Sequence, residues 1–154
     1  MSKRLLLLTV SFLVGGSVAS GGALAAGQST NASSLGDQVV SLVNKERAKV
    51  GCKPLGNDSR LALAAQRHSD DMSKRNYFSH TSLDGSDFGQ RAVRAGYPNP
   101  AAENIAMGYT SAAQVMQGWM ASDGHRHNIL ECSLKNVGVG VATQGWYWTQ
   151  DFGR

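Results

Sequence analysis

The hydrophobic residues of this 154-residue chain follow two different periods, and this change of period constrains the fold more than any other feature. Over residues 35–75 apolar side chains recur at helical spacing. Near the C-terminus the period becomes two, because Val137, Val139 and Val141 alternate with small residues. Such alternation is typical of a β-strand with one buried face. Helices first and an antiparallel hairpin last predict an α+β domain in which helices pack against a sheet.

The same patterns place the individual elements. Helices are expected over residues 35–50, 57–75 and 86–95, and from Ser111 to residues 123–124. A short strand is expected at residues 103–107, and a hairpin pairs residues 137–142 with residues 147–152. Gly138 and Gly140 leave room on one face of this hairpin for large side chains of a covering layer, which we expect to be aromatic.

The first 26 residues have the layout of a secretory signal peptide. Lys3 and Arg4 precede a short apolar core at residues 5–14, and small residues follow, with cleavage expected after Ala25 or Ala26. A membrane anchor is the alternative, but the apolar core is shorter than the roughly 20 residues that span a bilayer. We therefore expect a secreted or periplasmic protein with no transmembrane anchor after cleavage, a flexible lead-in at residues 27–34 and one domain at residues 35–154.

Charge and cysteine content point to an exported, disulfide-bonded chain. Removal of Lys3 and Arg4 lowers the formal net charge from +4 to +2, and no run of basic residues remains that would bind nucleic acid. Cys52 and Cys132 both lie in the exported part, where two thiols most simply form one disulfide. The bridge would stabilise the fold by about 4 kcal/mol in the chain-entropy model. We expect a monomer.

Three polar residues are candidates for a shared cleft. His68 falls on the buried stripe of its helix, Glu103 follows a loop with two prolines, and His125 lies in the polar segment 122–130. Glu103 can be a general base, a metal ligand or a buried acceptor that holds His68. His68 can equally be a hydrogen-bonded core residue, and His125 can cap the preceding helix. The chain contains no zinc-protease helix, nucleophile elbow or phosphate-binding glycine loop.

Several segments together resemble the CAP superfamily, also called the SCP-domain family, in its bacterial secreted branch. This superfamily includes the cysteine-rich secretory proteins, insect venom antigen 5 and plant pathogenesis-related proteins. The matching blocks are AQRHSDDM at 65–72, FSH at 78–80, RAGY at 94–97, ENIA at 103–106, WMASDGHRHNIL at 119–130, VGVGV at 137–141 and YWTQ at 147–150. Each block is modest alone, but their order is specific to the family.

The resemblance implies a three-layer α-β-α sandwich whose central cleft is lined by two His and two Glu, sometimes with a divalent metal such as zinc. When the cleft residues of the family are carried over to this sequence, the first His corresponds to His68 and the first Glu to Glu103. Ser122 takes the place of the second Glu, and His125 substitutes for the second His. His68, Glu103 and His125 are then the implied catalytic or metal-binding set. His80, Arg126, Asn128 and Tyr147 are weaker ligand-binding candidates.

Three functions remain open from the sequence. The first is a secreted binding module for a lipid, sterol-like or cell-wall ligand, as the resemblance implies. The second is a hydrolase of peptide or cell-wall polymer in which Glu103 and the two histidines activate water, with or without a metal. The third is a structural envelope protein whose polar cluster only maintains the fold. Whether the chain is an enzyme stays undecided at this point.

Overall fold

A computed structural model describes the chain from residue 23 onward, with side chains from residue 35. In this part the order of elements is α1 (Ala23–Lys49), β1 (Gly56–Asn57), α2 (Ser59–Arg75), α3 (Phe88–Arg94), β2 (Pro100–Met107), α4 (Ala112–Ala121), α5 (Asp123–Leu130), β3 (Asn136–Ala142) and β4 (Tyr147–Gly153). The strands form one sheet in the order β1-β3-β4-β2, with β1 parallel to β3 and the other pairs antiparallel. The predicted α+β class and hairpin are confirmed.

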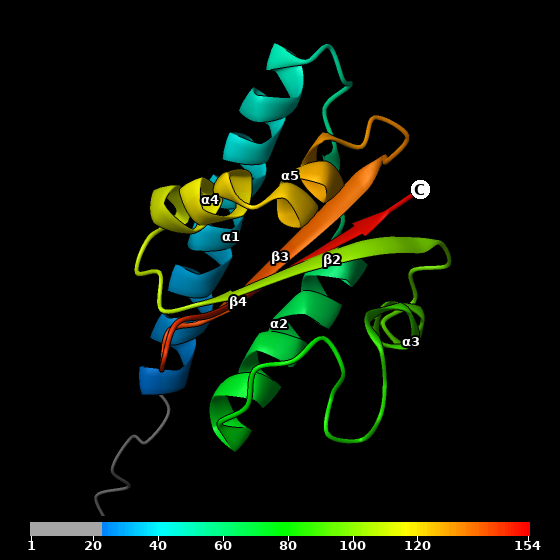
Figure 1. Cartoon of the computed structure of the whole chain (residues 1–154). Coiled ribbons are helices and arrows are strands. Elements are labelled where there is room, and N and C mark those ends of the chain that lie inside the picture. Colours follow the sequence, from blue (N-terminus) through cyan, green and yellow to red (C-terminus); the bar gives the residue numbers. More distant parts are fainter. Residues whose placement is uncertain (1–22) are drawn as a thin grey trace, which may run out of the picture.

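The three-layer sandwich is also confirmed. Helices α2 and α3 lie on one face of the sheet, and α1, α4 and α5 lie on the other (Figure 1). On the α1 face, Val137, Val139 and Val141 pack with residues of α1 and α4, and Trp148 and Phe152 of β4 join them in one buried cluster. The alternation along β3 therefore separates the apolar core from the face covered by α2.

The N-terminal helix is longer than the sequence pattern indicated. Helix α1 begins at Ala23, so the backbone of residues 27–34 is helical where a flexible lead-in was expected. No proline interrupts this stretch, and a helix nucleated by the packed turns after Leu35 can propagate backward through it. The predicted signal peptide lies mostly outside the described residues and stays a prediction. Within the described part, none of the helices combines the length and apolarity needed to cross a membrane.

Helix α2 approaches the sheet so closely that its backbone, not an aromatic side chain, covers the glycines of β3. A Cβ atom on Gly138 would lie 2.0 Å from the backbone nitrogen of Ala62, and one on Gly140 would lie 2.2 Å from that of Gln66. The expectation of aromatic covering residues is therefore wrong. The Gln66 side chain also donates to the carbonyl of Val141 and accepts from its N–H, which satisfies that part of the β3 edge.

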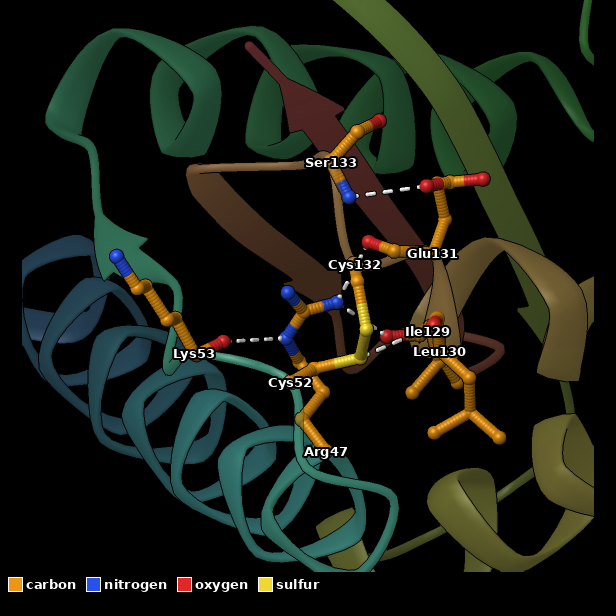
Figure 2. The surroundings of a disulfide bond; sticks show 8 residues. All are labelled: Arg47, Cys52, Lys53, Ile129, Leu130, Glu131, Cys132 and Ser133. Atoms are coloured by element: carbon orange, nitrogen blue, oxygen red, sulfur yellow. Dashed lines mark hydrogen bonds between the residues drawn. A yellow bond between two sulfur atoms is a disulfide. The ribbon is translucent and has the colours of Figure 1, made fainter.

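The predicted disulfide is present and joins the ends of two distant helices. Cys52 and Cys132 are bonded, with their Cα atoms 5.0 Å apart and a separation of 80 positions in the sequence. Beside the bridge, the buried guanidinium of Arg47 donates to the carbonyls of Lys53, Ile129 and Glu131 (Figure 2). The end of α1 is thus fixed to the end of α5 by a covalent bond and by the two hydrogen bonds of Arg47 to Ile129 and Glu131, while the bond to Lys53 fixes the loop after α1.

Candidate functional site

Glu103 on the edge strand β2 is the centre of the polar site. Its side chain is 1% exposed, and both carboxylate oxygens are occupied. Oε1 accepts a hydrogen bond from Nδ1 of His80 at 2.7 Å, and Oε2 accepts one from Nη2 of Arg91 at 2.5 Å. Charge-assisted bonds of this kind are among the strongest in proteins, so the carboxylate is fixed in orientation.

Arg91, which the sequence analysis did not identify, holds the loop that carries His80. It points inward from the short helix α3, and its Nη1 donates to the carbonyls of His80 and Ser86 and to the hydroxyl of Ser82. One guanidinium therefore fixes both Glu103 and the loop that brings His80 to Glu103. The sequence could have indicated this role, because Arg91 falls on the buried face of a predicted helix. Charged residues in such positions are almost always paired.

Asp151, a second missed residue, lies directly opposite Glu103 on the neighbouring strand β4. Its side chain is buried, and neither carboxyl oxygen accepts a hydrogen bond from a donor in the described part of the chain. Burial first, then the charge of Glu103, raises the pKa of Asp151 well above its usual range, while Arg91 lowers it. We therefore assign Asp151 as a carboxyl group that keeps its proton in the folded protein.

The structure does not bring His68 into contact with Glu103. The buried ring donates from Nε2 to the carbonyl of Ser79 at 2.9 Å and accepts at Nδ1 from the hydroxyl of Ser82 at 3.3 Å. Burial, and next the charge of Arg91, lowers the pKa of His68, so the ring is neutral. Of the two alternatives, the hydrogen-bonded core residue is the one observed. His68 anchors the 79–82 segment from which His80 projects.

His125 lies near His80, on the first turns of α5. Burial, and next the charge of His80, lowers the pKa of His125. Asn104 of β2 donates to the carbonyl of His125 at 3.2 Å, and Asn128 donates to the side-chain oxygen of Asn104 at 2.9 Å. These amides fix α5 against β2 and so place His125 beside that strand. The direct contact of the Glu103 carboxylate with a histidine is with His80 and not with His68.

The remaining weak candidates have structural contacts. Arg126 donates to the carbonyl of Met120 at 2.9 Å and pairs with Asp123, which joins α5 to the end of α4. Asn128 connects α5 to β2 as described above. Tyr147 is buried against Met72 and Ile105. Asn128 also donates to the backbone carbonyl of Glu103 at 3.4 Å, and in the described part of the chain none of the three side chains bonds to the side chain of His80 or Glu103.

The residues present do not fit the predicted zinc site. No group of three or more His, Cys, Asp or Glu side chains within residues 35–154 is arranged to hold a metal ion. The position beside Oε2 of Glu103 is taken by the guanidinium of Arg91, which already supplies the positive charge. His68 uses both ring nitrogens in other bonds. We therefore derive no step through a metal.

Fold and site place the chain in one family. The model of the cysteine-rich secretory protein family (CAP) matches residues 40–152, and the chain belongs to this family. It is similar to the uncharacterized protein YkwD of Bacillus subtilis (strain 168), with 42% identity over 116 residues. It is also similar to the uncharacterized membrane protein YlbC of the same strain, with 37% identity over 117 residues. Each match covers 75% of this chain, but 45% of YkwD and 33% of YlbC.

Solved structures agree with this assignment. An extracellular protein containing an SCP domain from Bacillus anthracis str. Ames aligns with a TM-score of 0.80 and 32% identity, over 88% of this chain and 45% of that one. A cysteine-rich secretory protein from Staphylococcus aureus aligns with a TM-score of 0.67 over 80% of this chain and 39% of that one. Its 19% identity supports the fold alone. The chain thus spans less than half the length of each of these relatives.

Proposed function

We propose that this chain is a binding module that acts outside the cytoplasm and recognises a lipid or cell-wall ligand through His80 and His125. The observation that carries the proposal is the state of Glu103. Because its side chain is 1% exposed and its two oxygens accept from His80 and Arg91, Glu103 orients the site and does not itself face a ligand. His80 remains 56% exposed, so its Nε2 is available to a ligand.

An extracytoplasmic location is consistent with three observations. The sequence begins with the predicted signal peptide, and the domain contains a disulfide, which persists in oxidising compartments. The similar protein from Bacillus anthracis is described as extracellular. A binding role for the site follows from its chemistry, because a partly exposed imidazole of fixed orientation is a directional hydrogen-bonding group.

Hydrolysis is the second candidate, and one contact favours it. A carboxylate bonded to Nδ1 of a histidine fixes the tautomer in which Nε2 can take a proton from water. Glu103 and His80 have this arrangement, and His125 lies nearby. Covalent catalysis has less support, because both cysteines are in the disulfide and the buried Ser82 hydroxyl accepts a bond from Arg91.

The test uses the exposed histidine and a matched control from the same helix as His125. Soluble peptidoglycan fragments and vesicles of phosphatidylglycerol are added to the protein, and the imidazole signals of His80 and His125 are followed by NMR. We expect one probe to shift both signals and His80→Gln to weaken its binding about tenfold, the value of one hydrogen bond to a charged group. His127→Gln, on the exposed side of α5, should change binding by less than about twofold.

The outcomes separate the candidate functions. Equal binding by the wild type and His80→Gln, or unmoved signals with both probes, would overturn the binding proposal. Mass spectrometry of the same peptidoglycan fragments reports cleavage. Products formed by the wild type and lost in His80→Gln would replace the binding role with hydrolysis.

A further inference from the structure

A polar cavity of about 220 Å³ lies on the other side of Arg91, between α2 and the segment that leads into α3. Its charged wall consists of Arg67, Arg75, Arg91 and Arg94, with Asp71 and Asp84. We call it the arginine cavity. It contains neither Glu103 nor His125, so it is separate from the ligand site proposed above, although Arg91 contributes to both.

The wall of the arginine cavity carries an excess of one positive charge. Arg75 pairs with Asp71 at 3.0 Å, and Arg91 pairs with Glu103 behind the wall. Arg94 approaches Asp84 only to 3.7 Å. Arg67 forms no ion pair with any residue in the described part of the chain. Glu103, which is not part of the wall, already balances Arg91, so Arg67, Arg75 and Arg94 face the two carboxylates of the wall. A ligand with one negative charge would balance the remaining positive charge.

A buried donor without an acceptor supports a ligand at this position. Arg91 is 7% exposed, and its Nε–H has no hydrogen-bond partner among the described residues although the other nitrogens of its guanidinium are bonded. Buried charged donors are rarely left without an acceptor, because their desolvation is then uncompensated. Arg91 lines the cavity, so an anion that reaches its guanidinium would supply the missing acceptor. His68, in the same wall, is neutral because burial lowers its pKa, and it adds no further charge.

We propose that the arginine cavity binds the singly charged phosphate of a phosphodiester. Guanidinium groups recognise phosphate by paired hydrogen bonds, and a tetrahedral phosphate can accept from arginines of α2 and α3 at once. A phosphate monoester carries about −1.5 to −2 charges at neutral pH and exceeds the surplus on the wall. At about 220 Å³ the cavity is smaller than most ligand pockets, so it takes the phosphate and not a whole ligand.

An adjoining hollow leaves space for the two ester substituents. This hollow of about 740 Å³ shares Asp84, Ser86 and Arg94 with the arginine cavity and extends along α3 to Val93 and Pro100. Phosphate esters from two sources would present the same chemistry here, a phospholipid head group or a soluble polymer with phosphodiester links. The experiment distinguishes these two sources.

The primary measurement is calorimetric binding of glycerophosphoglycerol, a soluble phosphodiester, to the full mature chain. We expect Arg67→Gln to weaken binding about tenfold, since one charged hydrogen-bonding partner is lost. Lys74→Gln removes the same charge from an exposed position of the same helix, outside the cavity wall, and should change binding by less than about twofold. Binding should also weaken as salt rises from about 0.05 M to about 0.5 M.

Further measurements test whether the cavity prefers a phosphodiester to another anion, and whether that phosphodiester belongs to a lipid or to a soluble polymer. Phosphatidylglycerol vesicles that bind the wild type but not Arg67→Gln indicate a lipid head group, whereas binding of the soluble diester alone indicates a polymer. Either result supports the proposal. Absence of diester binding, equal losses in Arg67→Gln and Lys74→Gln, or equally tight binding of acetate would overturn it. Circular dichroism of both variants checks that the fold is intact.

Discussion

Among single residues, the charge balance around Glu103 decides how the site is built. Arg91 compensates the buried carboxylate of Glu103, and Asp151 opposite it is neutral. If both carboxyl groups were ionised, one guanidinium would face two buried negative charges in close contact. A proton held by Asp151 removes that excess of negative charge. The orientation of His80 depends on this arrangement through its bond to Glu103.

Arg91→Met should be strongly destabilising. It leaves the carboxylate of Glu103 buried without its counter-charge, which costs about 3–5 kcal/mol in typical cases. Urea unfolding monitored by circular dichroism measures the loss. The double variant Arg91→Met/Glu103→Gln should recover part of it, because the uncompensated charge is then removed as well. A loss below about 1 kcal/mol for Arg91→Met would contradict the assigned ion pair.

Asp151→Asn should change the pH dependence of stability. Because the pKa of Asp151 is raised in the folded state, its contribution is fully present below the unfolded value of about 4 and is lost as pH rises toward the folded value. Asparagine does not titrate, so the variant should gain stability relative to wild type above about pH 4, by at most 1.4 kcal/mol per pH unit. Urea unfolding between about pH 4.5 and 7.5 measures this. A difference that is constant with pH would mean that Asp151 is ionised.

The sequence predicted a site at His68, Glu103 and His125, with His80 as a weaker candidate. In the structure His80 is the histidine that bonds to the carboxylate of Glu103. Helical periodicity correctly placed His68 on a buried face, and burial is the reason that both of its ring nitrogens bond to the 79–82 segment. His80 follows in an irregular loop, where no periodicity indicates direction. The direction of His80 becomes clear only in the structure, where Arg91 donates to the backbone carbonyl of His80 and holds the loop.

For the elements, the closest packing is that of α2 on β3. Gly140→Ala should destabilise the fold by about 3 kcal/mol or more, because its Cβ would overlap backbone atoms of α2 that cannot move without the helix. Gly124→Ala in α5 is the matched control, since nothing lies within 4 Å of its Cβ. It should be neutral or stabilising by up to about 1 kcal/mol. Urea midpoints measure both, and equal effects would show that α2 does not contact β3 as described.

Elements with several turns or a clear alternation were predictable, and short ones were not. Helix α2 and the hairpin of β3 and β4 have long apolar patterns and agree with expectation. Strand β1 contains two exposed residues, and α5 has polar residues over most of its length. Neither has a hydrophobic period, because tertiary hydrogen bonds and the disulfide hold them in place. Helix α5 nevertheless positions His125, so part of the site depended on an element without a sequence signal.

Taken as a whole, the molecule brings the site together where three separate segments meet at the edge of the sheet. Glu103 comes from the edge strand β2, His80 from the loop before α3, and His125 from α5. The layers could be predicted from the order of elements and the family resemblance. The point where the three segments meet could not be predicted in the same way. It depends on hydrogen bonds of Arg91, Asn104 and Asn128, which fix the loop before α3 and helix α5 to strand β2. The described residues do not fit the possible zinc site for the same reason, since Arg91 takes the position beside Glu103.

The disulfide provides the last prediction, because it closes the longest covalent loop of the domain. Cys52→Ser/Cys132→Ser should lower the free energy of unfolding by about 4 kcal/mol, since the unfolded chain regains the freedom of an 80-residue loop. The fold itself should persist, because two hydrogen bonds of Arg47 hold the same helix ends without the disulfide. Urea unfolding gives the free energy, and the NMR spectrum of the variant reports the fold. A variant that loses its dispersed spectrum would show that the hydrogen bonds of Arg47 need the covalent bridge to form.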